Sequence, residues 1–298
     1  MIPGWRQRWV VAVGIALGAV AWWFAGGLLI AGDGTPGYVV ADARVGWLVG
    51  AAAVALLGVV AVGMGGVAAA TGQPLSGMVV IAASLTVLAW RGGASMGFFW
   101  RHDLPGGYGL LLVEAVWWLA GALVACLGLQ RLRDAMRRGR GDAQHGGGGA
   151  SRTASLWTVP LATSASSVAA AVLGAVLAWL IVRTTDPAQV IGGLALSYLV
   201  AGGLAYLFTP YANPVGAVIS PLIGGVAVYG WLATGGAGQA DLLLLAYGES
   251  LSGLALALPM QLASAGVLGA CLGVALAQGI DAARKAEQAA ARADGARP

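Results

Sequence analysis

The feature that most constrains this chain is a series of apolar runs, each about 20 residues long and nearly free of charge. A helix of that length crosses the hydrocarbon core of a bilayer, which is about 30 Å thick. Only 9% of the 298 residues are charged, against about 25% in a soluble domain, so lipid is the predicted solvent. Because backbone groups in lipid must bond within their own segment, the predicted fold class is all-α. The eight runs cover roughly 9–31, 46–70, 74–90, 109–130, 157–182, 187–208, 215–233 and 251–278.

Two of these runs close on nearly the same sequence. Residues 121–128 are Gly-Ala-Leu-Val-Ala-Cys-Leu-Gly, and residues 266–273 are Gly-Val-Leu-Gly-Ala-Cys-Leu-Gly. Earlier in each half, Leu-Gly-Ala-Val occurs at 17–20 and again at 173–176. Matches that recur in the same order along a chain indicate an internal repeat. The sequence therefore predicts a polytopic integral membrane protein with about eight transmembrane helices, arranged as two tandem four-helix repeats.

A basic, glycine-rich stretch separates the two predicted repeats. It has six arginines between positions 131 and 152 and four consecutive glycines at 146–149. Glycine-rich stretches of this kind behave as flexible linkers. Because each repeat has an even number of spans, the two repeats are predicted to be parallel, related by an axis along the membrane normal. The predicted divisions are a first repeat at 1–130, a cytoplasmic linker at 131–156, a second repeat at 157–280 and a basic cytoplasmic tail at 281–298.

The lysines and arginines predict how the chain is oriented in the membrane. The net charge of +4 is compatible with nucleic-acid binding, but 12 of the 16 basic residues lie on one predicted side, beside the ends of the apolar runs. Basic residues concentrate in cytoplasmic segments of membrane proteins. Both termini are therefore predicted to be cytoplasmic, in a bacterial inner membrane, and no nucleic-acid partner is expected. The four basic residues of the predicted outer loops are Arg44, Arg91, Arg101 and Arg183.

Glu114 is the only carboxylate well inside an apolar run. It lies about five residues into the fourth run, roughly 8 Å below the outer edge at 1.5 Å per residue. One interpretation is an ion or proton site, because ionisable groups within spans are rare and usually face protein or water. The other is a structural carboxylate paired with an outer-loop arginine. The position that matches it in the second repeat is Pro259 rather than a second acid, which favours the structural interpretation.

A charged group follows the aromatic residues at 98–100 in a predicted outer loop. It consists of Arg101, His102 and Asp103. One interpretation is an outer vestibule that binds a ligand or transfers protons. The other is an interfacial segment, with aromatic rings among the lipid headgroups and charges in water. The matching stretch of the second repeat, 239–249, contains no histidine or arginine, which favours the interfacial interpretation.

Polar side chains within the spans could line a path through the bundle. Gln261 and Ser264 lie one helical turn apart in the eighth run, after Pro259, which is predicted to kink that helix and free a carbonyl group. Hydroxyl groups also cluster early in the fifth run, although hydroxyls in spans more often bond a carbonyl of their own or a neighbouring helix. The candidate polar path consists of Glu114, Thr163, Ser164, Ser167, Gln261 and Ser264.

The sequence provides few groups for catalysis or metal binding. Its two histidines, His102 and His145, both fall outside the apolar runs, so haem or metal ligation within the membrane is not expected. The chain has no phosphate-binding loop motif and no His-Glu-x-x-His motif. No catalytic residue, metal ligand or cofactor is predicted, and the chain is not expected to be an enzyme.

The leading functional hypothesis is permease- or channel-like movement of a small solute through a site between the two repeats. It rests on the internal repeat and on spans rich in glycine, of which the chain has 49. The alternative is a non-catalytic membrane-anchor subunit of a larger membrane complex, which the scarcity of polar groups in the spans favours. The predicted partners are the lipid bilayer, a small-molecule solute, and either other membrane subunits or further copies of this chain.

Overall fold

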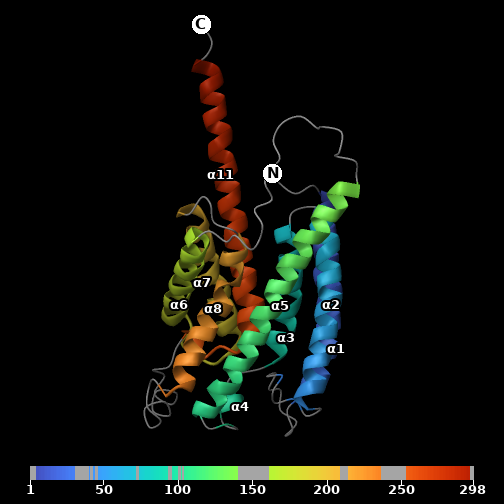
Figure 1. Ribbon diagram of the computed structural model, residues 1–298, viewed down its shortest axis with the longest axis vertical. Coiled ribbons are helices and arrows are strands. Elements are labelled where there is room, and N and C mark those ends of the chain that lie inside the picture. The colour runs from blue at the N-terminus through green and yellow to red at the C-terminus, as the bar shows by residue number, and fades with distance from the viewer. Residues whose placement is uncertain are drawn as a thin grey trace.

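The structure is a computed structural model in which the helices lie side by side in one elongated bundle (Figure 1). The last helix extends well beyond the others at the upper end of Figure 1. Every element of the described chain is helical, which confirms the all-α prediction. The structure describes residues 5–30, 40, 43, 46–71, 74–92, 96–99, 102, 104–139, 161–208, 214–235 and 253–295.

Eight long helices make up the described bundle, and six of them include a span long and apolar enough to cross a membrane. The other two have shorter apolar stretches, at Leu75–Arg91 and Ser167–Ile181. The prediction of a multi-pass membrane protein is therefore confirmed by helix length and composition. The long helices are α1 (Trp5–Ala25), α2 (Trp47–Thr71), α3 (Pro74–Arg91), α5 (Leu104–Gly139), α6 (Leu161–Ile181), α7 (Pro187–Phe208), α8 (Pro214–Ala233) and α11 (Val267–Gly295).

Prolines define where several of these helices begin. α3, α7 and α8 start at Pro74, Pro187 and Pro214, and the short helix α10 (Pro259–Gln261) starts at Pro259. Proline suits the first position of a helix, because its missing N–H would have no partner there and its fixed φ is already helical. The prediction that Pro259 kinks a continuous helix is therefore wrong. The eighth run is irregular before Pro259, and its helix begins at that residue.

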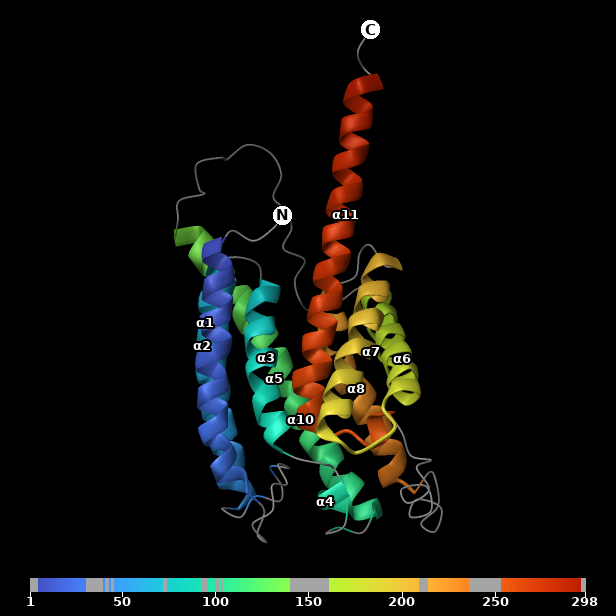
Figure 2. The ribbon, with the colours of Figure 1, turned by 180° about the vertical axis from the view of Figure 1, so that it is seen from behind.

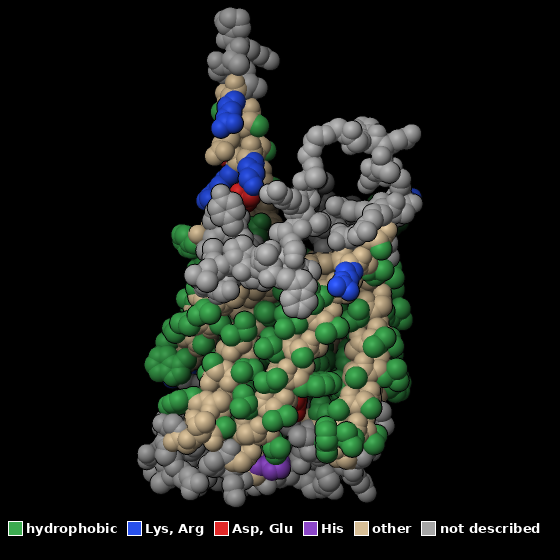
Figure 3. Space-filling view, viewed as in Figure 1, with side chains coloured by type: hydrophobic (Ala, Val, Ile, Leu, Met, Phe, Trp, Pro, Cys, Tyr) green, Lys and Arg blue, Asp and Glu red, His purple; other side chains and the backbone are tan. Residues whose placement is uncertain are grey.

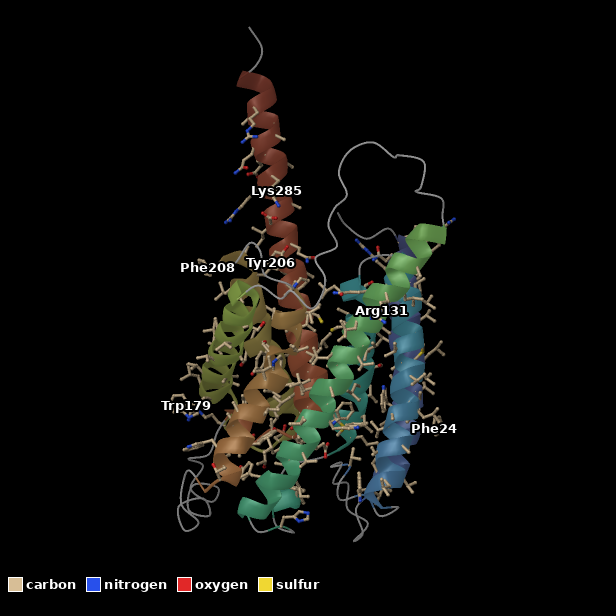
Figure 4. All side chains as sticks on the ribbon, viewed as in Figure 1. Phe24, Arg131, Trp179, Tyr206, Phe208 and Lys285 are labelled. Carbon is tan, nitrogen blue, oxygen red and sulfur yellow. The ribbon has the colours of Figure 1, made fainter. Side chains whose placement is uncertain are left out.

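The sides of the bundle are apolar, as expected of a surface that faces lipid. Figure 3 shows hydrophobic side chains over the described helices, with lysines and arginines toward the upper end. Large exposed aromatic residues lie near both ends: Phe208 at the upper end, and Phe24 and Trp179 at the lower end (Figure 4). Tryptophan favours the membrane–water interface, so the position of Trp179 is consistent with a bundle that spans the bilayer.

Arginines at the lower end of the bundle stack on tryptophans. The Arg91 guanidinium carbon lies 4.5 Å from the centre of a Trp23 ring, and that of Arg183 lies 5.3 Å from a Trp179 ring. Arg91 also donates a hydrogen bond to the Trp23 carbonyl oxygen. The flat guanidinium group binds a ring face while its other N–H groups can reach water or headgroups. These pairs place a cationic, aromatic rim at this end.

Glycines bring pairs of helices into backbone contact. A Cβ atom at Gly269 of α11 would overlap the carbonyl oxygen of Ala195 in α7, and Gly273 packs in the same way one turn further along. In the other part of the bundle, a Cβ atom at Gly77 of α3 would lie 2.6 Å from the carbonyl oxygen of Gly65 in α2. Small residues at such crossings allow the close packing that holds helices together in lipid. The glycine pair at 269 and 273 therefore seals this chain's own bundle.

Candidate functional site: an irregular segment in the core

The most unusual part of the bundle is an irregular, fully buried stretch, Gly253–Gly266, here called the core segment. It starts as a 3-10 turn (Gly253–Ala255), leaves helical geometry, and resumes as α10 and then as a π-helical turn (Leu262–Gly266) that leads into α11. All its residues are buried. Non-helical backbone at membrane depth occurs only inside protein or beside an aqueous cavity, and π-helical turns often mark functional sites. The core segment is therefore the first place to look for a binding site.

Gly253 allows the core segment to dock on the end of α6. Its φ of +69° lies in the left-handed region, where glycine is favoured. A Cβ atom at Gly253 would also lie 2.7 Å from the backbone nitrogen of Trp179. The Gly253 N–H donates to the carbonyl oxygen of Val182 at 3.0 Å. A residue with no side chain is thus needed both for the backbone conformation and for the contact.

Two buried tyrosines bond the carbonyl groups that the core segment frees. The Tyr108 hydroxyl of α5 donates to the Ala255 carbonyl oxygen at 3.0 Å, and the Tyr229 hydroxyl of α8 donates to the Ala257 carbonyl oxygen at 2.7 Å. The two tyrosine rings lie 6.2 Å apart, centre to centre. A carbonyl without a partner in this apolar core would be strongly destabilising, so the two hydroxyls stabilise the irregular backbone.

Tyr229→Phe should lower the free energy of unfolding by about 1–3 kcal/mol, because it leaves the buried Ala257 carbonyl without a donor. Tyr198→Phe is the matched control. The Tyr198 side chain is equally buried, but its hydroxyl has no hydrogen-bond partner within the described chain. Removing that hydroxyl should leave stability unchanged or raise it slightly. Thermal unfolding in detergent measures both variants, and equal losses would show that the Tyr229 hydrogen bond does not support the core segment.

Gln261 combines complete burial with an unpaired donor. Its side-chain Oε1 accepts a hydrogen bond from the Leu258 N–H at 2.8 Å, which joins the start of the helix to the extended residue before it. Its Nε2 has no hydrogen-bond partner in the part of the chain that the structure describes. Gln261 is 0% exposed, so the unpaired amide is shielded from water as well as from lipid. Buried polar groups are nearly always paired, and such an exception calls for an explanation.

The Ser264 hydroxyl, which is also part of the predicted path, is bonded within its own segment. Ser264 lies in the π-helical turn and donates to the Gln261 carbonyl oxygen at 3.3 Å, one turn back. Elsewhere in the bundle, Thr86 of α3 donates to the Ala82 carbonyl oxygen at 2.9 Å in the same manner. Hydroxyls that bond their own helix are common in membrane spans. The structure thus brings Gln261 and Ser264 together, with Gln261 as the group left unpaired.

Glu114 of α5 bonds the backbone of Val40, which lies between α1 and α2 in the sequence. It is 5% exposed, and its Oε2 accepts from the Val40 N–H at 2.9 Å. Its Oε1 accepts from the Trp118 indole N–H at 3.1 Å, one helical turn along α5. A buried carboxylate is stabilised by N–H donors of this kind. These contacts are those of a structural carboxylate, and the sequence could not predict the Val40 partner, because it is a backbone group.

Several predicted site residues fall outside the described parts of the structure. Arg101 and Asp103 lie outside the described residues, while His102 is half-buried with its ring 4.5 Å from that of Phe98. Thr163 and Ser164 lie in the first turn of α6, but their side chains are outside the described set. Ser167 is buried on the same helix. The outer vestibule and the fifth-run part of the polar path therefore remain predictions.

Sequence reasoning missed the three buried tyrosines, Tyr108, Tyr198 and Tyr229. Among the residues that the structure covers, no group of three or more histidines, cysteines, aspartates or glutamates lies close enough to hold a metal ion. Comparison with protein-family models, curated proteins and solved structures gives no match. The core segment is therefore the part of the described chain whose geometry can indicate a function.

Proposed function

We propose that this protein binds a small solute at the core segment and carries it across the membrane. The observation that carries the proposal is the buried Gln261 amide, whose Nε2 is unpaired within the described chain. It lies at the start of a helix, beside backbone that is no longer helical. Transporters build solute sites from helix starts and non-helical backbone inside the membrane. Because Gln261 is fully enclosed, solute exchange requires the core segment or its neighbours to move.

We also infer that the helices form two tandem repeats, α1 to α5 and α6 to α11. A reciprocal packing pattern supports this inference. α1 packs against α2 and α3, and α6 packs against α7 and α8. Between the sets, α5 packs against α8, while the core segment and α11 pack against α3. A two-fold axis along the bundle would exchange the contacts of α1 with those of α6. It would also exchange the contact of α5 with α8 for that of α11 with α3, as expected for parallel repeats. This inference includes the divisions predicted from the sequence, at 1–130, 131–156, 157–280 and 281–298. The helix α5 continues past the first of these divisions to Gly139.

The same proposal places the upper end of the bundle in Figure 1 in the cytoplasm. α1 begins and α11 ends at this end (Figures 1 and 2). Arg131 and Lys285 also lie there (Figure 4). Basic residues favour the cytoplasmic side, which supports cytoplasmic termini in a bacterial inner membrane. The core segment would then lie nearer the outer face, because α10 is in the lower part of the bundle in Figure 2.

Solute uptake by the purified protein in liposomes tests the proposed function. Gln261→Ala should lower uptake at least about 10-fold, because it removes the unpaired amide. Glu114→Gln should leave uptake close to that of the wild type, because the Glu114 contacts hold Val40 and Trp118 rather than a solute. A large loss of uptake in Glu114→Gln, at an unchanged unfolding temperature, would instead support the ion-site interpretation of that residue. The absence of uptake for every solute class would contradict transport.

The alternative function, a non-catalytic membrane-anchor subunit, is favoured by one specific observation. Several glycines face outward, with no atom of the described residues within 4 Å of an added Cβ atom, at Gly58 and Gly63 of α2 and at Gly121 and Gly128 of α5. Outward glycines allow a helix of another subunit to approach closely. A partner that co-purifies with the protein, together with the absence of uptake, would support this function.

A further inference from the structure

The hydrogen bond that Gln261 makes to the backbone fixes which end of its amide is free. Oε1 accepts from the Leu258 N–H at 2.8 Å. Turning the amide over would bring Nε2, a donor, against the Leu258 N–H, which is also a donor. The amide is thus held with its two side-chain N–H groups directed away from Leu258. Any molecule that satisfies them must supply an oxygen or another hydrogen-bond acceptor.

The charges around the core segment argue against an ionic ligand. Glu114 is the only charged side chain among the buried residues of the described chain. A bound anion would therefore have no buried cation to balance it, and a bare charge in an apolar core is strongly disfavoured. A bound cation would face the positive ends of the Gln261 N–H groups and of the helix start. An uncharged acceptor avoids both penalties.

We propose that Gln261 recognises an uncharged polar solute through a carbonyl or hydroxyl oxygen. The inference rests on the proposed transport function and narrows it to one class of solute. The residues on either side of Gln261, Met260 and Leu262, are apolar and fully buried. A compact molecule with one or two acceptor oxygens is sufficient to accept from the two N–H groups of a single amide. Urea, acetamide and glycerol are suitable probes, with chloride and sodium as charged comparisons.

The experiment measures uptake of radiolabelled urea, acetamide, glycerol, chloride and sodium into liposomes that contain the purified full-length protein. At least one neutral probe should enter faster than into empty liposomes, while chloride and sodium should not. Gln261→Met, which keeps the side-chain length but removes the amide, should lower neutral uptake about 10-fold. Ser220→Ala is the matched control and should transport like the wild type. It removes a buried hydroxyl that bonds the Ala217 carbonyl oxygen of its own helix, α8, at 2.7 Å.

Each other outcome overturns a defined part of the proposal. Uptake of chloride or sodium without any neutral probe would overturn the solute class and leave transport intact. No uptake of any probe would overturn both. Neutral uptake that Gln261→Met leaves unchanged would overturn the role of Gln261. Should Gln261→Met fail to fold, Gln261→Glu keeps an oxygen for the Leu258 N–H and removes the amide donors. It should also reduce neutral uptake, and wild-type uptake by this variant would overturn the proposal.

Discussion

Gly269→Ala should destabilise the bundle by about 3 kcal/mol, because there is no room for a methyl group where α11 crosses α7. The added Cβ atom would overlap the carbonyl oxygen of Ala195, which belongs to rigid helical backbone and cannot move aside alone. The two helices would have to separate along their contact. Thermal unfolding in detergent, followed with a thiol-reactive dye, measures the effect, because Cys126 and Cys271 are free thiols that are buried in the folded protein.

Gly279→Ala on the same helix is the control for this prediction. A Cβ atom at Gly279 would meet no other atom within 4 Å. Alanine also has the higher helix propensity, by up to about 1 kcal/mol in water, so this variant should be neutral or slightly stabilised. Equal destabilisation of Gly269→Ala and Gly279→Ala would show that α7 and α11 do not meet at Gly269.

Gly253→Ala should have an effect of similar size, about 3 kcal/mol, because two penalties combine at this position. The φ of +69° disfavours a residue with a side chain, and the added Cβ atom would lie 2.7 Å from the backbone of Trp179. The core segment would lose its position on the end of α6. Both the unfolding temperature and neutral-solute uptake should therefore fall.

Gly235→Ala separates these two penalties. Gly235 has a similar φ of +76°, but an added Cβ atom there would have no neighbour within 4 Å among the residues that the structure describes. This variant should lose only the conformational part, about 1–2 kcal/mol. If Gly253→Ala were no more destabilising than Gly235→Ala, the core segment could not be packed tightly against Trp179.

Much of the helical framework could be predicted from the sequence, because the backbone of a long apolar run in lipid must form its hydrogen bonds within the run, as a helix does. α7 has the predicted bounds, 187–208, and α3 and α8 begin at or next to the prolines that start their runs. The core segment could not be predicted. Its residues are as apolar as those of a buried helix. The hydrophobic pattern alone therefore does not distinguish an irregular buried segment from a buried helix. Gly253 followed six residues later by Pro259 was the available signal.

The candidate site was predicted only in part. Gln261 stood out as a polar residue within an apolar run, and the structure places it, fully buried, in the core segment. The tyrosines were missed because tyrosine in a span usually indicates an interfacial position. Tyr198 lies near the middle of α7, too far from either end for that role, and this was the signal for a buried hydroxyl. The backbone partner of Glu114, Val40, is 74 positions away and has no distinctive side chain.

Transport at the core segment requires that a solute from water reach Gln261, although the residue is 0% exposed in the structure. Thiol labelling of Gln261→Cys tests it most directly, in protein whose Cys126 and Cys271 are replaced by alanine. A small, water-soluble thiol reagent should label Gln261→Cys in liposomes. Ala201→Cys, at an equally buried position of α7, should not be labelled. Labelling of neither cysteine would show a permanently dry core and contradict the transport site.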